Sequence, residues 1–375
     1  MKRKLAVIGG SYLQLPLVLK AQEMGLEVHC FAWKDGAVCE NVADFYYPIS
    51  IIEKDIILEK CREIGIDGVT SIASDLAVLT VNYIANHLGL TGNNDAFSYI
   101  QTNKYAMRRC FDEAGVPSPR YHRLSSTQSI PSFGDWRWPL IVKPTDRSGS
   151  RAVQKVETQE QLRAAVQEAI GVSFAGEAIV EEFITGVEVS VESISWKGEH
   201  YVLQITDKVT TEDRFVEIAH HQPSLLPGII KERIRNIVRE ALTAMHVENG
   251  ASHAELKITG EGDICIMEIG ARMGGGFIGS HLVPLSTGYD YTRGVIEIAL
   301  GYFNKPDFTL SKCSGIFFLT KETSYLAGII ERAKDYPDIV VAARTENEIR
   351  PAISESDRTG YVIYQSNHRI ISFCG

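Results

Sequence analysis

Apolar runs and amphipathic stretches alternate over the first ninety residues of the chain. Residues 5–9 form a short apolar run that ends at Gly9-Gly10, and a helical pattern over 13–24 leads to a second apolar run over 27–33. The alternation continues with a helix over 54–64, a strand over 68–72 and a helix over 76–88. Strands and helices that alternate with short connections predict a doubly wound parallel sheet. Such a sheet binds ligands at the carboxyl ends of its strands.

The rest of the chain predicts a mixed architecture. A helix over 103–114 leads into a stiff Gly-Val-Pro-Ser-Pro linker at 115–119, which is a plausible boundary. The later patterns predict strands over 140–144, 178–183, 188–195, 253–258 and 264–269, with helices over 159–170 and 230–245. A strand-rich tail follows residue 305. The expected fold class is therefore α/β, or α+β overall, and we expect three regions: 1–92, 93–304 and a small α+β region over 305–375.

Composition and charge narrow the classes of function. Of the 375 residues, 45% are hydrophobic and 23% are charged, as in ordinary globular proteins. The net charge of −9 does not provide the positive field that proteins use to bind nucleic acid or anionic lipid, and no apolar run reaches the length of a membrane helix. Seven widely spaced cysteines without a C-x-x-C pair predict reduced thiols and a cytoplasmic location. The basic, apolar start resembles a signal peptide only superficially, because polar residues and a proline soon interrupt it.

Two lysines have settings that suit an anion. Lys104 lies on a predicted helix, and Lys143 ends an apolar strand, where an ammonium group is costly unless it meets a negative charge. The loop that follows contains Ser148, Gly149 and Ser150, whose backbone N–H groups can surround phosphate oxygens. Each lysine taken alone is better explained as a surface residue whose charge reaches the solvent.

A second feature suits a nucleoside. The strand that contains Glu181, Glu182, Phe183 and Ile184 carries two adjacent carboxylates, and Glu188 follows after a glycine turn. The backbone of this segment can pair with an adenine edge while Glu188 reaches ribose hydroxyls. A solvated edge strand explains the segment equally well when it is considered alone.

A third feature is the hairpin expected from the strands 253–258 and 264–269. It places Glu255 and Glu268 so that both carboxylates can face one side. Magnesium beside a polyphosphate binds through one or two such carboxylates. Arg272 follows at once and can neutralise a transferred phosphoryl group or clamp a carboxylate. Apolar residues flank both glutamates closely, which favours this interpretation over an ordinary surface hairpin.

These motifs occur in an order that resembles the ATP-grasp superfamily over roughly residues 5–300, most closely its amino-acid and dipeptide ligases, which are carboxylate–amine ligases. The resemblance implies a pre-ATP-grasp domain (1–92) and a two-lobed ATP-grasp domain (93–304), with a nucleotide lobe near 118–183 and a catalytic lobe near 184–304. It implies that ATP is bound by Lys104, Lys143, Ser148, Gly149, Ser150, Glu181, Glu182, Phe183, Ile184 and Glu188. It further implies a Mg²⁺ (or Mn²⁺) site at Glu255 and Glu268 and a catalytic role for Arg272.

The resemblance also implies a mechanism. ATP phosphorylates a carboxylate, an amine attacks the acyl phosphate, and ADP, phosphate and an amide are released. The expected partners are therefore ATP and small carboxylate and amine substrates, without nucleic acid or membrane, and a homodimer is left open. One departure concerns Gly270, because many members of the superfamily have asparagine two residues after the second metal carboxylate. His220 and His221 are candidate proton acceptors, although a histidine with ordinary structural partners is the commoner case.

Two alternatives accompany this hypothesis. A purine-biosynthesis type of ligase or carboxylase would activate formate or bicarbonate. A sugar-phosphate acceptor would need further cations, for which Arg293 is the nearby candidate. A non-catalytic nucleotide-binding protein is the other alternative, although the intact set of lysines, glutamates and arginine counts against it.

Overall fold

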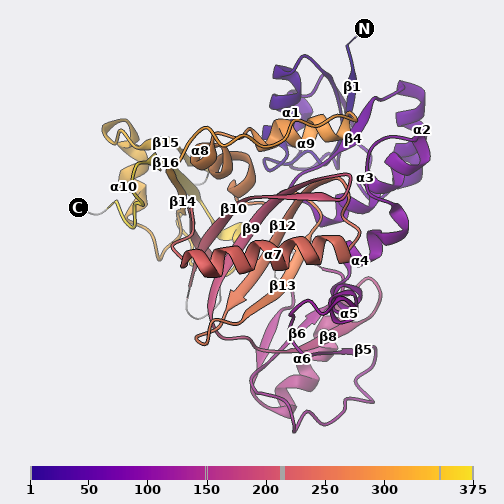
Figure 1. Ribbon diagram of the computed structural model, residues 1–375, viewed down its shortest axis with the longest axis vertical. Coiled ribbons are helices and arrows are strands. Elements are labelled where there is room, and N and C mark those ends of the chain that lie inside the picture. The colour runs from indigo at the N-terminus through magenta and orange to yellow at the C-terminus, as the bar shows by residue number, and fades with distance from the viewer. Residues whose placement is uncertain (1, 148, 150, 212–215, 346–347, 374–375) are drawn as a thin grey trace.

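Three β-sheets organise the chain in the computed structural model, which describes residues 2–147, 149, 151–211, 216–345 and 348–373 (Figure 1). The first is a parallel sheet in the order β3-β2-β1-β4, built from β1 (Lys4–Ile8), β2 (Glu27–Phe31), β3 (Phe45–Tyr47) and β4 (Gly68–Thr70). The helices α1 (Leu15–Glu23), α2 (Lys54–Ile64) and α3 (Asp75–Leu88) alternate with these strands. The predicted parallel α/β arrangement is confirmed.

The second sheet is antiparallel and smaller. It has the order β5-β8-β6-β7, with β5 (Tyr121–Leu124), β6 (Leu140–Pro144), β7 (Gln154–Val156) and β8 (Ala178–Glu182). The helix α6 (Gln159–Val172) packs on it through a row of buried side chains, which shares a core with β6 and β8. Two helices, α4 (Ser98–Thr102) and α5 (Lys104–Ala114), lead into this sheet, and Asn103 caps α5 by accepting a hydrogen bond from the backbone N–H of Ala106.

The third sheet is antiparallel and has eight strands in the order β13-β12-β9-β10-β11-β14-β16-β15. Its strands are β9 (Val187–Trp196), β10 (Glu199–Thr210), β11 (Glu217–Gln222), β12 (Gly250–Ile258), β13 (Ile264–Gly270), β14 (Cys313–Phe318), β15 (Ile339–Arg344) and β16 (Gly360–Ser366). The strands expected in a separate tail continue this sheet, because β14 pairs with β11. The remaining helices are α7 (Gly228–Ala244), α8 (Val283–Thr287), α9 (Tyr291–Ala299) and α10 (Leu326–Glu331). Short 3₁₀ helices lie at Val38–Asn41, Asp95–Phe97, Ala333–Asp335 and Glu355–Asp357, and a short π-helix lies at Ile278–Leu282.

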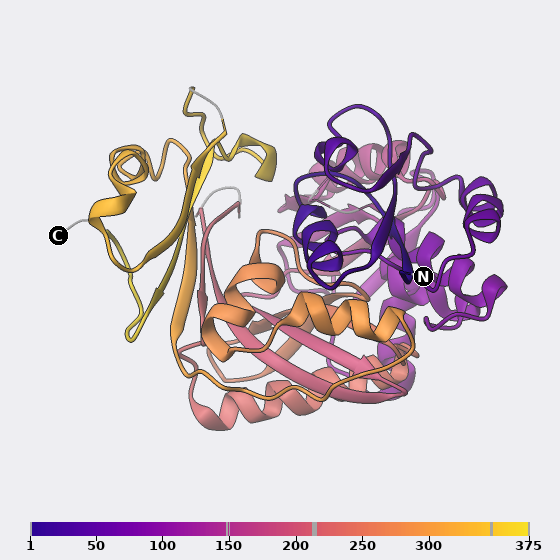
Figure 2. The same cartoon turned by 90° about the horizontal axis from the view of Figure 1, so that it is seen from above.

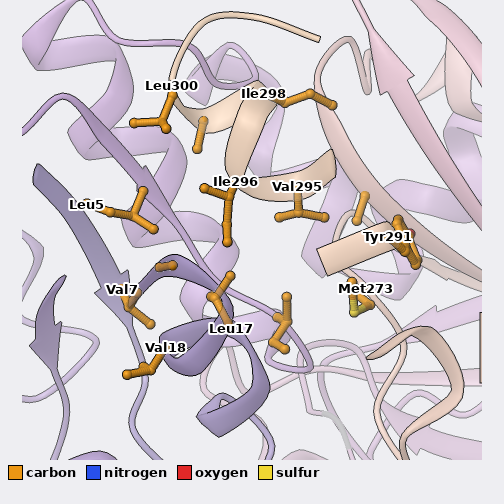
Figure 3. Close-up of a cluster of buried hydrophobic side chains, with 14 of the residues drawn as sticks. Leu5, Val7, Leu17, Val18, Met273, Tyr291, Val295, Ile296, Ile298 and Leu300 are labelled. Carbon is orange, nitrogen blue, oxygen red and sulfur yellow. The ribbon is translucent and has the colours of Figure 1, made fainter. Parts of the chain in front are cut away.

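A shared core fixes the N-terminal sheet against the rest of the chain. Leu5 of β1 and Leu17 of α1 pack in one cluster with Ile296 of α9, and all three are fully buried (Figure 3). The contact extends to the backbone, because a Cβ added at Gly68 would lie 2.6 Å from the carbonyl oxygen of Ala299. The carboxyl ends of the parallel strands therefore have a fixed position relative to the large sheet.

The large sheet uses its two faces differently. Val189 and Val191 of β9 contribute to a buried cluster with α7, while the alternate residues Glu188, Ser190 and Glu192 project from the opposite face. In Figure 2 the C-terminal strands of this sheet lie on the left and the N-terminal unit lies on the right, with the middle strands of the sheet between and below them. Among the described residues no helix is long and apolar enough to cross a membrane.

Candidate active site

A buried lysine lies at the centre of the charged face of the large sheet. The Nζ of Lys208, on β10, lies 2.7 Å from Glu188, 2.6 Å from Glu217 and 3.0 Å from Glu255, and its side chain is 3% exposed. Burial alone would lower the pKa of Lys208, but the three carboxylates raise it well above its usual value. One cation therefore holds together acidic side chains from β9, β11 and β12.

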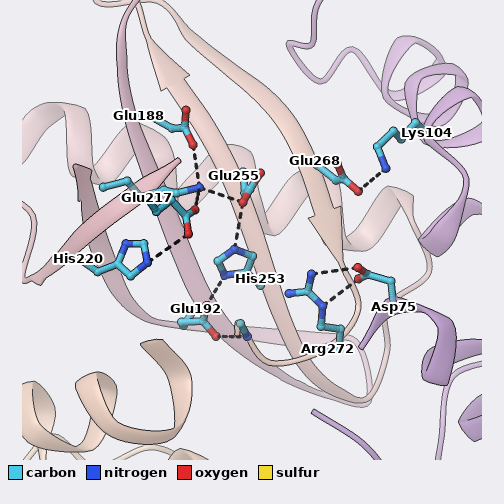
Figure 4. A network of polar contacts seen from close by, with 12 residues as sticks. Asp75, Lys104, Glu188, Glu192, Glu217, His220, His253, Glu255, Glu268 and Arg272 are labelled. Atoms are coloured by element: carbon cyan, nitrogen blue, oxygen red, sulfur yellow. Dashed lines mark hydrogen bonds and ion pairs between the residues drawn. The ribbon is translucent and has the colours of Figure 1, made fainter. Parts of the chain in front are cut away.

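The hairpin of β12 and β13 places the two predicted metal carboxylates opposite each other. Glu255 and Glu268 are register partners, so their side chains leave the same face of the sheet (Figure 4). Glu255 accepts from Lys208, whose charge holds the pKa of the Glu255 carboxyl far below its usual range. Glu268 forms an ion pair with the Nζ of Lys104 at 2.9 Å.

The two predicted nucleotide lysines both enter this region. Lys104 begins α5 and also donates to the carbonyl oxygen of Arg147, which opens the loop expected to hold phosphate. Burial alone would lower the pKa of Lys104, but Glu268 raises it above its usual value. Burial lowers the pKa of Lys143, although its Nζ lies 2.8 Å from Glu181. Gly149 has the left-handed φ of +70°, while Ser148 and Ser150 lie outside the described residues.

The segment predicted to bind a nucleoside has one inward and one outward carboxylate. Glu181 is buried and pairs with both Lys143 and the fully buried Arg108, at 2.8 Å each. The neighbouring Glu182 accepts from the backbone N–H of Arg137 at 3.1 Å instead, as strand alternation requires. Phe183 and Ile184 follow the strand and are half-buried.

Arg272 pairs with an acidic side chain of the N-terminal unit. Its Nε and Nη2 donate to the two carboxylate oxygens of Asp75 at 2.8 and 3.2 Å, in a two-point arrangement (Figure 4). Burial alone would raise the pKa of Asp75, but Arg272 lowers it. A Cβ added at Gly270 would lie 2.7 Å from the Asp75 Oδ1. A side chain at position 270 would therefore require Asp75 or its partner Arg272 to shift.

A fully buried glutamate connects the loop after Arg272 to Glu255, one of the two predicted metal ligands. Glu192 accepts from the backbone N–H of Gly274 through Oε2 at 3.0 Å, and its Oε1 contacts Nδ1 of His253. Burial alone would lower the pKa of His253, but Glu192 raises it to about 9. The imidazolium Nε2 lies 3.5 Å from Glu255. This chain of contacts fixes the position of the Gly274 backbone relative to the hairpin.

The adjacent histidines have different surroundings. His220 is fully buried and its Nε2 lies 3.4 Å from Glu217, while burial lowers its pKa. The Nδ1 of His221 bonds the hydroxyl of Tyr364 at 3.0 Å, and burial lowers the pKa of His221 to about 4. His221 is therefore neutral and has an ordinary structural partner, whereas His220 lies at the edge of the charged network.

The sequence analysis assigned no role to several residues of this network, namely Asp75, Arg108, Glu192, Lys208, Glu217 and His253. Asp75 follows β4, at the strand end where parallel sheets place ligand sites, so that rule could have identified it. Lys208 lies within a strand that contains apolar residues, the same signal that drew attention to Lys143. Glu192 occupies one of the polar positions of a strand that alternates apolar and polar residues. The pattern alone suggests that its side chain is solvated, yet Glu192 is fully buried.

The donor set suits a metal–polyphosphate group better than a metal held by protein alone. Within the described part of the chain, no group of three or more His, Cys, Asp or Glu side chains could hold a metal ion. Glu255 and Glu268 offer two hard oxygen donors on one face, with cationic side chains beside both. Magnesium bound mainly by phosphate oxygens needs only one or two carboxylates from the protein. The residues present therefore fit such a group.

Comparisons with known proteins identify the domain that carries most of these residues. Residues 136–281 match the ATP-grasp domain family, so the chain contains an ATP-grasp domain, and the resemblance found in the sequence is confirmed. The alanine–anticapsin ligase of Bacillus subtilis is 27% identical over 310 residues, which are 73% of this chain and 65% of that protein. The chain thus spans about two thirds of the length of that relative.

Two further similarities cover nearly the whole chain. The L-arginine-specific L-amino acid ligase of Bacillus subtilis is 22% identical over 382 residues, covering 90% of this chain and 88% of that protein. The crystal structure of an L-amino acid ligase from Bacillus licheniformis has the same fold, with a TM-score of 0.84 and 21% identity over 98% of this chain and 94% of that one. The mixed α/β fold expected from the sequence is confirmed.

Proposed function

We propose that this ATP-grasp protein is an ADP-forming ligase that activates a carboxylate by phosphoryl transfer from ATP and joins it to an amine, with amino acids as substrates. The observation that carries this proposal is the pair Glu255 and Glu268, opposed on one face and flanked by Lys104 and Lys208. Phosphoryl transfer requires mainly positioning and charge neutralisation from the protein. The relatives named above are ligases, which supports the same reaction class.

In this proposal ATP lies between the small sheet and the large one. Lys104 and Lys143 hold phosphate oxygens, together with the loop that contains Ser148, Gly149 and Ser150. The segment that contains Glu181, Glu182, Phe183 and Ile184 holds the adenine, and Glu188 holds the ribose. Each lysine has a carboxylate partner at hydrogen-bond distance, so it can turn from that carboxylate to a phosphate without becoming an unpaired buried charge.

Magnesium supplies charge neutralisation on the phosphate oxygens when it is bound, and Glu255 and Glu268 are its proposed protein ligands. Lys208 keeps Glu255 ionised and therefore able to serve as an oxygen donor. His253 contacts the same carboxylate and is itself oriented by Glu192. The chain's own residues thus keep the metal ligands charged and in place.

The ion pair between Asp75 and Arg272 suits a zwitterionic substrate. An α-amino acid carries one carboxylate and one ammonium group, which are the complements of Arg272 and Asp75. Arg272 can clamp the carboxylate with both nitrogens and neutralise charge as the phosphoryl group arrives. No side-chain nucleophile is needed for this chemistry.

The purine-type alternative receives less support. A sugar-phosphate acceptor would need additional cations, and the nearby candidate Arg293 points to Glu297 at 2.9 Å with a side chain that is 58% exposed. A non-catalytic protein would have no need of the buried network around Lys208.

The test is a phosphate-release screen of the purified chain with ATP and magnesium against all amino acids, singly and in pairs. Product masses should show an amide with loss of one water, and ADP rather than AMP should accumulate. Lys60→Ala, on the exposed face of α2, is the control for a change of one surface charge. Absence of amino-acid-dependent ADP formation with every pair would reject the proposal.

A further inference from the structure

Three aromatic side chains from distant parts of the sequence meet beside the loop that follows Arg272. They are Tyr12, in the turn after β1, Phe277, and Tyr361 on β16, and we call them the aromatic wall. The ring centroids of Phe277 and Tyr361 are 4.5 Å apart, and those of Phe277 and Tyr12 are 6.2 Å apart. The N-terminal unit, the central region and the C-terminal strands therefore each contribute one ring.

Phe277 has an unusual backbone for its residue type. Its φ is +64°, in the left-handed region that non-glycine residues rarely adopt. Its ring is nevertheless held firmly, since it is 9% exposed and also packs edge-to-face on His281 at 5.1 Å. Residues held in such conformations cluster at ligand sites, because the surrounding structure must hold them in place. The ring of Phe277 therefore has a fixed position within the aromatic wall.

The wall is continuous with the proposed active site. Gly274 donates its backbone N–H to Glu192, and a Cβ added at Gly276 would lie 3.5 Å from Nε2 of His220. Phe277 is the next residue in the chain, so it directly follows the segment that borders the charged network. Tyr12 stands at the carboxyl end of β1, where a parallel sheet places its ligands, and it is 54% exposed.

We propose that the aromatic wall receives the side chain of one amino acid substrate, and that it selects a large apolar or aromatic amino acid. This inference rests on the proposed ligase function and names the substrate class for the same site. Ligand sites combine a few placed charges with apolar and aromatic walls. Here the charges at Asp75 and Arg272 suit the amino acid's common groups, and the wall offers aromatic rings to its variable group.

The test measures kcat/KM for phosphate release with one amino acid held constant and its partner varied among phenylalanine, leucine, alanine and glutamate, each tried in both positions. The aromatic wall predicts that, at one position, kcat/KM for phenylalanine or leucine exceeds kcat/KM for alanine by about tenfold or more. A few methylene groups in an apolar pocket change kcat/KM to that extent. A flat profile, or a preference for alanine or glutamate in both positions, would overturn the inference.

Tyr12→Ala separates recognition from folding, because the residue is exposed. We expect about a tenfold rise in KM for the large substrate and a smaller rise in KM for alanine, with an unchanged KM for ATP. Tyr302→Ala, a tyrosine that is 40% exposed and follows α9, is the matched control and should leave all constants unchanged. An equal loss with every amino acid, or no change at all, would overturn the inference.

Two failures can be told apart. If no amino acid supports ADP formation in the unaltered protein, the proposed function and this inference both fall. If amino acids are ligated but side-chain size does not respond to Tyr12→Ala, the function stands and the aromatic wall is not the side-chain site. Phe277→Leu gives a second measurement within the same apolar class and should reduce the preference for phenylalanine over leucine, and an unchanged preference would contradict the wall.

Discussion

Replacing Gly274 by alanine tests whether the loop after Arg272 must be held against Glu192. The added Cβ would lie 2.4 Å from the Oε1 of Glu192 and 2.6 Å from the Nδ1 of His253. Both neighbours are side-chain ends, but they cannot turn away freely. Glu192 is fully buried and both of its carboxylate oxygens already have partners. The loop must therefore shift, and with it the backbone that leads to Arg272 and Phe277.

The magnitude follows from two local losses. Overpacking a filled site costs about 1–3 kcal/mol, and a hydrogen bond to a charged acceptor contributes about 1.5–3 kcal/mol. The smaller values add to about 2.5 kcal/mol. If the displaced loop destabilises the transition state by this free energy, kcat/KM decreases by roughly 70-fold. If it falls on folding instead, the thermal midpoint decreases and the remaining folded protein retains its activity.

The assay combines steady-state ADP formation with thermal unfolding of the same preparation. Gly328→Ala is the matched control, because Gly328 lies in α10 and a Cβ there would meet nothing within 4 Å. That change should be neutral or stabilise by about 0.4–1 kcal/mol. In a Glu192→Ala background, Gly274→Ala should cost less, since the carboxylate is gone. An unchanged midpoint together with kcat/KM within twofold of the unaltered protein would refute the reasoning.

Three further changes test the assigned roles. Lys143→Ala should abolish ATP binding measured by calorimetry while the ligand-free melting curve persists, because Arg108 still neutralises Glu181; unchanged affinity and turnover would reject this role. Glu268→Gln should retain nucleotide binding but lose magnesium-dependent turnover, and near-normal rates at saturating magnesium would show that the carboxylate is not a ligand. Arg272→Lys should reduce the rate more than ATP affinity, because lysine keeps the charge but loses the planar two-point contact. With carboxylate oxygen-18 as substrate label, one labelled oxygen should appear in phosphate, whereas label in AMP would indicate adenylation and contradict an acyl phosphate.

The predicted secondary structure agrees with the fold where local periodicity is strong. The parallel strands and their helices follow from alternating apolar runs, and the hairpin that opposes Glu255 and Glu268 follows from two apolar strands and a glycine turn. The strands after residue 305 were found as strands, but their place in the eight-stranded sheet was not. Pairing of β14 with β11 joins residues about a hundred positions apart, and no local pattern encodes such a pairing.

The sequence by itself identified candidate residues for phosphate and metal chemistry, because a lysine at the end of an apolar strand and paired glutamates in a hairpin are costly unless each charge meets a partner. The tertiary structure decided what those charges meet. Arg272 forms an ion pair with Asp75 across the interface with the N-terminal unit, and Lys208 forms ion pairs with three carboxylates from separate strands. Glu192 is indistinguishable from a solvated strand residue until its face is covered. Burial and charge partners depend on how the sheets pack, and that packing is a property of the whole chain rather than of any segment.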